Sequence, residues 1–282
     1  MYEVHFGLLE KPFQMQPDPE YIYWSKTHSL AYTMLEYGVL NSSGFTVITG
    51  EVGSGKTTLL RFLLSNIDTH VRVGLLSNTQ LKEGELLRWV MMTFGQRYDQ
   101  SSDIATFHEF QEFLIAEYAN HRRVLLLIDE AQNFSVRTLE ELRMLSNINV
   151  DKEQLLQVVL VGQPELRDIL RRPELTQFAQ RINSDFHLKV LNTHEATDYI
   201  YRRLEQAGGS PALFSHRAAR RAAIAADGNP RLINMLCDTA LVYAYSREEP
   251  LVSLRVMNKV IADKMEHGLF FKQQVNKSIA DE

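Results

Sequence analysis

The segment Gly50–Thr57, with the sequence GEVGSGKT, decides the fold expected of this chain. It fits the phosphate-binding pattern G-x-x-x-x-G-K-[ST] at every fixed position. The apolar, β-branched run Phe45–Thr49 before it is typical of a buried parallel strand, and the apolar spacing of Thr58–Leu64 after it is typical of a helix. A strand, a glycine-rich loop and a helix in this order form a cradle for phosphates. The segment therefore predicts that the chain binds ATP.

Each part of this loop has an expected role in holding the nucleotide. The glycines let the backbone bend so that N–H groups face phosphate oxygens, Lys56 reaches the β- and γ-phosphates, and Thr57 ligates Mg²⁺. A glycine-rich turn with a chance lysine is the alternative, and the flanking strand and helix argue against it. The expected nucleotide-binding residues are Gly50, Glu51, Val52, Gly53, Ser54, Gly55, Lys56, Thr57 and Thr58.

Length and composition indicate an ordinary globular protein with about two structural units. The 282 residues are 45% hydrophobic and 23% charged, and 30 Lys and Arg against 35 Asp and Glu give a formal net charge of −5. That balance provides no global attraction to nucleic acid or to an anionic membrane. The single cysteine, Cys237, excludes an intrachain disulfide, and the sequence has neither an export signal nor an apolar run long enough to cross a bilayer. We therefore expect a cytoplasmic chain without a membrane span.

The alternation of apolar strands with helical patterns predicts the fold class. Besides 45–49, strands are expected at 71–76, 123–128, 155–161 and 185–190, with helices at 83–94, 106–118 and 135–147. This order predicts an α/β P-loop fold, in which a mostly parallel five-stranded sheet carries helices on both faces. The nucleotide should lie beyond the carboxyl ends of the strands. After residue 191 only helices are expected, at 193–206, 215–227, 230–246 and 253–265, which predicts a small all-helical lid.

Four segments follow from these patterns. They are a proline- and aromatic-rich arm with a helix at 1–43, an ATPase core at 44–191, the helical lid at 192–267 and a polar tail at 268–282. The aromatic residues of the arm indicate an ordered segment, since a flexible tail would contain fewer of them. Their rings could form an adenine pocket beside the phosphate site or could serve only to pack the arm, and the sequence favours neither.

Two carboxylates follow the apolar strand that ends at Ile128. Asp129 is expected to hold Mg²⁺ through its water shell, and Glu130 to orient and deprotonate the attacking water. The alternative is that both acids merely begin the next helix, where negative charge is favoured. Because the chain already contains a phosphate-binding loop, the pair predicts hydrolysis of ATP in addition to binding.

This arrangement of motifs, strands and helical lid resembles the AAA+ ATPases, and the resemblance implies roles for three further residues. Gln163, just after the fourth strand, matches the polar sensor near the γ-phosphate, and Arg231, after a predicted Asn229 cap and Pro230, resembles the second sensor on the lid. Arg181 lies where such proteins carry an arginine finger that reaches the nucleotide of a neighbouring subunit. The rival fingers are Arg167, Arg171 and Arg172.

The arm narrows the resemblance to the ExeA/GspA-type secretion ATPases, which include ATPases of exosortase-linked exopolysaccharide loci. The motifs that match are Phe6–Gly7, Lys11–Phe13, Pro17–Pro19, Gly50–Thr58, Asp129–Gln132, Gly162–Leu166 and Gly228–Arg231. The resemblance covers residues 1 to about 265. It implies an oligomeric ATPase that couples its nucleotide state to envelope secretion or exopolysaccharide export. Full-length secretion members continue into a membrane span and a peptidoglycan-binding domain, so direct anchoring to the cell wall is not carried over.

Two other functions fit the sequence. Transposition ATPases resemble the same core, and a basic stretch of the lid predicts DNA binding by such a protein. Its positive residues are Arg202, Arg203, Arg217, Arg220, Arg221 and Arg231, set against Glu205 and Asp227. A solvated or subunit-contacting helix face explains that stretch equally well. The last alternative is a switch that binds ATP and scarcely hydrolyses it.

Overall fold

The structure is a computed structural model that describes residues 1–40, 44–77, 81–97, 102–150 and 153–267. It consists of two compact units. The α/β unit comprises residues 26–52 and 56–189, and the helical unit comprises residues 1–25, 53–55 and the chain from residue 190 on. The predicted polar tail at 268–282 lies outside the described residues. The arm and its following helix, predicted as one segment, are thus divided between the two units.

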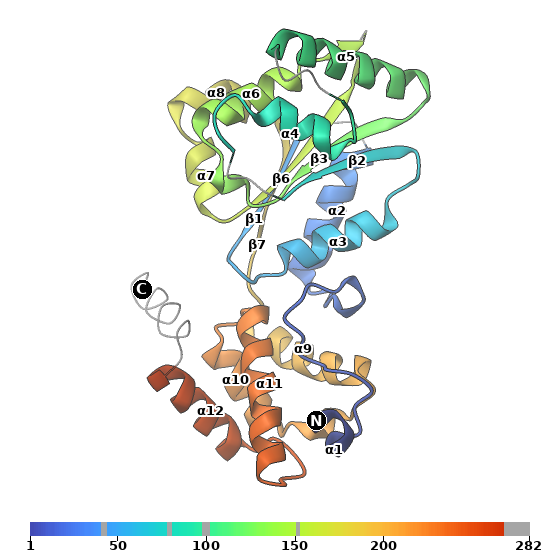
Figure 1. Cartoon of the computed structure of the whole chain (residues 1–282). Helices are drawn as coiled ribbons and strands as arrows, with labels where there is room; N and C mark the ends of the chain where they lie inside the picture. The colour runs from blue at the N-terminus through green and yellow to red at the C-terminus, as the bar shows by residue number, and fades with distance from the viewer. Residues whose placement is uncertain (41–43, 78–80, 98–101, 151–152, 268–282) are drawn as a thin grey trace. The chain divides into compact units, whose positions relative to one another are not determined.

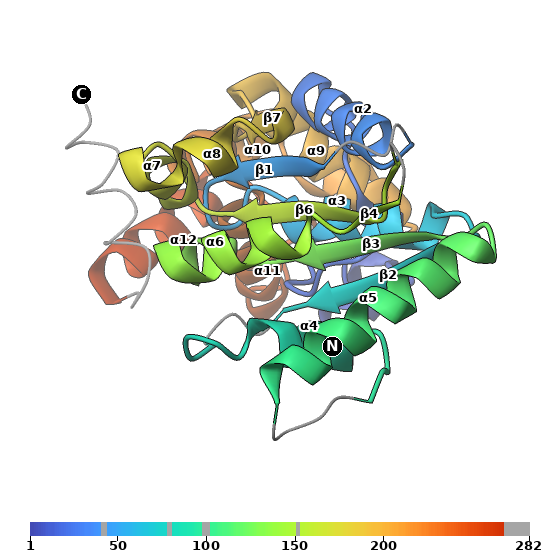
Figure 2. The same cartoon turned by 90° about the horizontal axis from the view of Figure 1, so that it is seen from above.

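The α/β unit is built on a five-stranded parallel sheet (Figures 1 and 2). In spatial order its strands are β2 (Val71–Leu76), β3 (Arg123–Ile128), β6 (Leu156–Gly162), β1 (Phe45–Gly50) and β7 (Ile182–Leu188). The central strands β1 and β6 are buried along their whole length, as their mostly apolar and β-branched sequences predict. The predicted fold class is confirmed, and the carboxyl ends of β1, β3 and β6 lie side by side at one edge.

Helices cover both faces of this sheet. On one face lie α2 (Lys26–Leu40) and α3 (Lys56–Asn66). The other face carries α4 (Leu86–Thr93), α5 (Asp103–Ala119), α6 (Val136–Leu145), α7 (Glu165–Leu170) and α8 (Thr176–Ala179). Alternate residues of each strand point to opposite faces, so Val124, Leu126 and Ile128 join one apolar core with α4 to α8.

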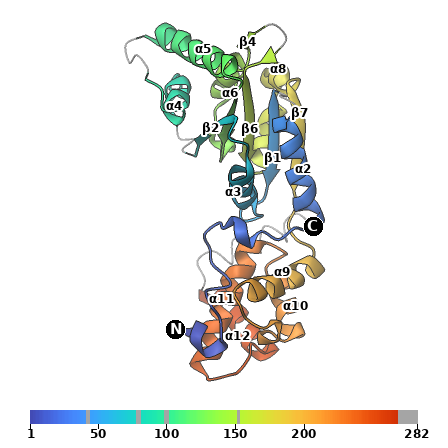
Figure 3. The same cartoon turned by 90° about the vertical axis from the view of Figure 1, so that its right-hand side faces the viewer.

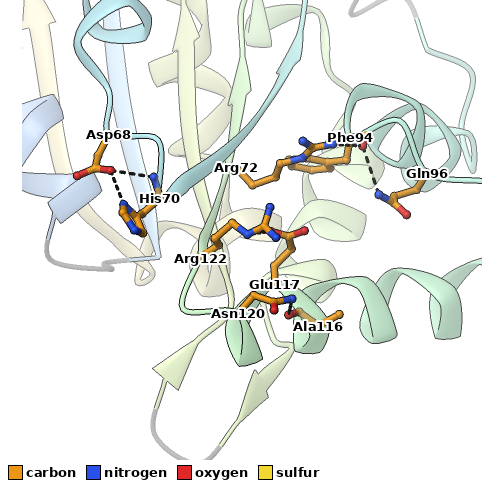
Figure 4. A network of polar contacts seen from close by, with 9 residues as sticks. All are labelled: Asp68, His70, Arg72, Phe94, Gln96, Ala116, Glu117, Asn120 and Arg122. Atoms are coloured by element: carbon orange, nitrogen blue, oxygen red, sulfur yellow. Dashed lines mark hydrogen bonds and ion pairs between the residues drawn. The ribbon is translucent and has the colours of Figure 1, made fainter.

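A polar network fixes the loops that lead into strands β2 and β3 (Figure 4). Before β2, Asp68 accepts hydrogen bonds from both the backbone and the ring of His70, each at 2.8 Å. Arg72 on β2 donates to the carbonyl of Phe94 at 2.9 Å, which ties the strand to the end of α4. Before β3, Arg122 forms an ion pair with Glu117 at 3.4 Å. These contacts lie at the beginnings of the two strands.

Several elements of the α/β unit differ from the predicted ones; α4 begins at Leu86 and not at 83, and α5 begins at Asp103 and not at 106. The chain after α6 forms a short antiparallel hairpin of β4 (Asn149–Val150) and β5 (Glu153–Gln154), where no element was expected. Strand β7 begins at Ile182, three residues before the predicted start at 185. Asn183 and Asp185 are polar and exposed, so a search for apolar runs misses the first residues of this edge strand.

The helical unit contains α9 (Thr193–Gln206), α10 (His216–Ala225), α11 (Pro230–Ser246) and α12 (Leu254–His267). Capping residues set their starts: Asn192 forms a capping box with Glu195, and Asn229 accepts hydrogen bonds from the backbone N–H groups of Arg231 and Leu232. One face of α10 is made of buried alanines, which let α9 and α12 pack closely against it. Across the described ranges, no helix is long and apolar enough to cross a membrane.

The first 25 residues pack onto these helices (Figure 3). The arm contains α1 (Tyr2–Phe6) and a 3-10 turn, η1 (Pro19–Tyr21). Tyr2 donates to Asp238 on α11 at 2.5 Å, and the rings of Phe6 and Phe13 are buried in the core of the helical unit. Of the two interpretations of the arm, these rings support packing, because a ring buried there cannot line an adenine pocket.

A buried arginine also holds the arm. Arg203 on α9 is only 5% exposed. It donates to the carbonyl of Pro12 at 2.6 Å and to that of Gln14 at 3.3 Å, and its guanidinium lies 4.2 Å from the centre of the Tyr21 ring. An arginine inside an apolar core is costly unless its donors are satisfied. The arm supplies these acceptors, so its packing on α9 satisfies the buried guanidinium.

Candidate nucleotide site

The loop Gly50–Thr57 runs from the end of β1 into the first turn of α3. Gly53 and Gly55 have φ angles of 83° and 101°, in a region that L-residues with side chains rarely adopt. Lys56 and Thr57 are the first two residues of α3, so their backbone N–H groups belong to the positive end of that helix. The loop therefore has the backbone geometry of an anion-binding turn, as its sequence predicts.

Lys56 is held inside this loop. Its ammonium donates to the carbonyl of Gly50 at 2.7 Å and to that of Glu51 at 2.9 Å, and the residue is 8% exposed. Burial lowers the pKa of the amine, although the nearby carboxylates of Glu130 and Asp129 oppose the shift. A buried ammonium that donates to two neutral carbonyls would bind phosphate oxygens more strongly, because hydrogen bonds between charged groups are stronger.

Thr57 and Asp129 lie together at the carboxyl edge of the sheet. The hydroxyl of Thr57 donates to Oδ2 of Asp129 at 3.3 Å. Burial raises the pKa of Asp129, and the charge of Glu130 adds to the shift, while a hydrogen bond from the backbone N–H of Glu130 opposes it. A hydroxyl and a carboxylate are hard oxygen donors of the kind that Mg²⁺ prefers.

The donor set fits magnesium better than a metal held by protein ligands alone. Among the described residues, no group of three or more His, Cys, Asp and Glu side chains could hold a metal ion. A cation here would complete its coordination with water and phosphate oxygens, as Mg²⁺ does in phosphate-binding sites. Thr57 and Asp129 therefore fit a magnesium ion that arrives with a nucleotide.

Glu130 stands at a sharp bend where β3 gives way to the 3-10 turn η2 (Ala131–Asn133). Its backbone is left-handed, with φ of 56°, which is uncommon for a residue other than glycine and typical of functional sites. Its Oε2 accepts hydrogen bonds from the side-chain amides of Gln132 at 2.6 Å and Gln163 at 3.1 Å. Burial alone would raise the pKa of Glu130, but these two hydrogen bonds and the charge of Lys56 lower it. The carboxylate is thus kept ionised and held in place.

Gln163 lies between the two motifs. Strand β6, which precedes it, runs between β1 and β3, so the structure places Gln163 at the same edge as Asp129 and Glu130. Its backbone N–H donates to Oε1 of Gln132 at 3.0 Å. Sequence reasoning gave Gln132 no role, although a glutamine two residues after Glu130 was a signal that could have been followed.

The expected arginine finger and its three rivals belong to the α/β unit. Arg181 precedes β7, whose first residue pairs with Phe45 at the start of β1. Because the loop Gly50–Thr57 follows the end of β1, Arg181 lies at the opposite end of the sheet from the loop of the same chain. Its guanidinium is 3.4 Å from the hydroxyl of Ser146. The three rivals are on or directly after α7, and Arg171 and Arg172 are exposed.

Arg231 belongs to the helical unit. It is an exposed residue in the first turn of α11, after the Asn229 cap and Pro230, as the sequence predicts. Its backbone N–H donates to the carbonyl of Gly53 at 3.4 Å, and both residues belong to the helical unit. Its role as a sensor stays a prediction.

The basic stretch expected to bind DNA is smaller than the sequence indicates. Arg203 is buried under the arm, so including it in a DNA-binding face was wrong. Arg202 is paired with Glu205 at 3.3 Å, and Arg221 donates to Asn258 at 3.1 Å. Arg217 and Arg220 remain as exposed members of the set on α10.

Similarity to known proteins agrees with the motifs. Residues 40–170 match the model of a family described as AAA domain. The chain is 40% identical over 248 residues to general secretion pathway protein A of Aeromonas hydrophila. This alignment covers 88% of the chain and 45% of that relative, so the chain spans less than half of the relative's length.

Solved structures show the same fold at low sequence identity. Cdc6p of Pyrobaculum aerophilum has a TM-score of 0.67 at 14% identity, covering 87% of this chain and 68% of that one. The ORC2 protein of Aeropyrum pernix has a TM-score of 0.62 at 17% identity, covering 84% and 67%. The RuvB Holliday junction branch migration motor of Thermotoga maritima has a TM-score of 0.59 at 17% identity, covering 94% and 80%. These solved structures show the fold alone, whereas the sequence match and the family model show that the chain is similar to general secretion pathway protein A and matches an AAA domain over residues 40–170.

Proposed function

We propose that the chain binds ATP with Mg²⁺ at the loop Gly50–Thr57 and hydrolyses it with Glu130 as the general base. The observation that carries this proposal is the hydrogen bond of 3.3 Å from the Thr57 hydroxyl to Oδ2 of Asp129. It lies beside a buried Lys56 and an ionised Glu130 that hydrogen bonds hold in place. A phosphate-binding turn alone would explain the loop but not this pair of carboxylates.

Different residues have separate roles in the proposed hydrolysis. Backbone N–H groups of the loop and the ammonium of Lys56 bind the phosphates, which replace the carbonyls of Gly50 and Glu51 as partners of that ammonium. Thr57 and Asp129 would hold Mg²⁺, which would supply positive charge to the phosphate oxygens. Glu130 orients the attacking water and accepts its proton, a step that an ionised carboxylate can perform.

We further propose that the activity serves envelope export through subunit contacts. The similarity to a protein named general secretion pathway protein A supports a place in secretion, and the exopolysaccharide export that its family resemblance suggests is the same class of process. Arg181 lies remote from its own loop in the α/β unit, which suits a residue that acts on a neighbouring subunit. Arg231, in the first turn of α11, is proposed as the sensor of the helical unit.

The test of hydrolysis compares three single substitutions. Glu130→Gln should keep ATP binding and lower turnover by about 10²- to 10⁴-fold, because a general base contributes about that much. Lys56→Ala should lose both binding and turnover. Glu174→Gln, at an exposed carboxylate of the 3-10 turn Pro173–Leu175, is the matched control and should change neither. Phosphate release and binding of a fluorescent ATP analogue are the two measurements. Wild-type turnover in Glu130→Gln would refute the assigned mechanism.

A further inference from the structure

We infer that Gln132 is a positioning residue, which acts through Glu130 and Gln163 and joins the catalytic base to the end of strand β6. The inference rests on the proposed hydrolysis and adds a residue to the same site. It is carried by three hydrogen bonds among Glu130, Gln132 and Gln163, which involve both ends of one side-chain amide.

The chemistry of these bonds determines which way the Gln132 amide points. Its nitrogen lies 2.6 Å from Oε2 of Glu130, and its oxygen lies 3.0 Å from the backbone nitrogen of Gln163. A carboxylate only accepts hydrogen bonds and a backbone N–H only donates them, so a flipped amide would lose both interactions. Gln132 therefore satisfies two different partners, one on each side of the site.

The two glutamines also act on the same oxygen. Gln163 donates from Nε2 to Oε2 of Glu130 at 3.1 Å, so this oxygen accepts from both amides. Both donors are neutral, and they fix the carboxylate without forming the ion pair that a lysine or arginine would make. Glu130 thus keeps its negative charge and has a defined orientation, the two properties that a general base needs.

The surrounding backbone leaves space for this contact. Gly162, the last residue of β6, has no side chain, and a Cβ there would come within 3.0 Å of Oε1 of Gln132 and 2.8 Å of the Leu166 side chain. On the other side, the left-handed conformation of Glu130 turns the chain so that Gln132 follows within the same 3-10 turn. A residue two positions after the base can therefore reach back to it.

Two substitutions of Gln132 distinguish its hydrogen bond to Glu130 from its hydrogen bond with the backbone N–H of Gln163. Gln132→Met retains a similar length and removes both interactions. Gln132→Glu retains an oxygen that accepts from the N–H of Gln163 but places a like charge beside Glu130. We expect both variants to lower kcat by about 10- to 100-fold, since a shift of about 1 Å in a reacting group has that effect, and to change ATP affinity by less than about threefold. Gln177→Met, at an exposed glutamine of α8, is the control and should leave both unchanged.

A second measurement needs no nucleotide. Hydrogen exchange at the backbone N–H of Gln163 should become about tenfold faster in Gln132→Met and stay slow in Gln132→Glu, because only the second variant keeps the acceptor. Equal exchange in wild type and Gln132→Met would overturn the contact itself.

A double substitution distinguishes positioning from general support of the fold. If Gln132 acts through Glu130, adding Gln132→Met to Glu130→Gln should leave the residual turnover unchanged within about twofold, since residues that act as a unit are non-additive. A further 10-fold loss would show that Gln132 supports the fold independently and would overturn the inference. Unchanged kcat in Gln132→Met, with Glu130→Gln inactive, would overturn the inference alone, whereas full turnover in Glu130→Gln would overturn both the inference and the proposed hydrolysis.

Discussion

Replacing Arg203 with alanine should detach the arm from the helical unit. The side chain contributes two hydrogen bonds to the carbonyls of Pro12 and Gln14 and lies against the Tyr21 ring. Arg202, the preceding residue, has a side chain that is 71% exposed and is paired with Glu205 in its own helix. The two neighbouring arginines therefore form a matched pair of sites, one that anchors the arm and one that is solvated.

The expected magnitude follows from these contacts. A hydrogen bond from a charged donor to a buried acceptor contributes about 1.5–3 kcal/mol, and a desolvated cation over an aromatic ring contributes about 2 kcal/mol. Removing the burial cost of the guanidinium offsets part of that sum. We expect Arg203→Ala to lower the free energy of unfolding of the helical unit by about 4 kcal/mol, and Arg202→Ala by less than about 0.5 kcal/mol. Arg203→Lys should fall between them, because an ammonium keeps the charge but not the planar fork.

Tryptophan fluorescence can follow the arm directly. The chain has two tryptophans, Trp24 in the arm and Trp89 in α4 of the α/β unit. A Trp89→Phe background leaves Trp24 as the single reporter, and urea titrations then give the stability of the arm on its helices. Limited proteolysis within residues 1–25 provides an independent readout, since a detached arm would be cut faster. If Arg203→Ala shifts the transition no more than Arg202→Ala, the arm is held by its apolar rings alone and the assigned anchor is wrong.

Two further predictions concern the nucleotide site and its neighbours. Asp129 has a raised pKa, so its stability contribution is fully present below the ordinary value of 3.8 and is lost as pH rises through the folded value. Asp129→Asn should therefore stabilise the nucleotide-free protein, by an amount that grows from about pH 4 toward neutrality in urea titrations; a gain that is independent of pH would contradict this account. Mixing inactive Arg181→Ala subunits with inactive Lys56→Ala subunits should restore part of the ATPase activity if Arg181 acts in trans, and absence of rescue in oligomers of proven mixed composition would exclude it.

Local signals in the sequence predicted most of the fold. The bounds of α9 and α11 agree with the expected helices to the residue, because Asn192 and Asn229 cap their first turns and the apolar pattern defines the rest. Strands β1, β3 and β6 are mostly apolar, so their composition reveals them. Strand β7 contradicts this rule because its exposed edge residues are polar.

Long-range contacts were beyond sequence reasoning. The distance in sequence between Pro12 and Arg203 gives no periodic signal, so the solvated basic face that the sequence predicts includes an arginine that is buried. The hydrogen bonds of Gln132 with Glu130 and Gln163 depend on the left-handed backbone of Glu130, a conformation that side-chain chemistry does not predict for glutamate. Motifs supplied the identities of Lys56 and Asp129, and tertiary structure supplied their partners.

The assignment of residues 1–25 to the helical unit has a consequence for how the chain folds during synthesis. The helices of that unit begin only after residue 190, so the α/β unit is in effect an insertion between the first and last parts of another folding unit. Domains form as units while the ribosome elongates the chain, so the sheet can form while the aromatic arm still lacks its helices. We expect ribosome-bound chains that stop near residue 190 to contain a folded sheet and an arm accessible to proteases or chaperones.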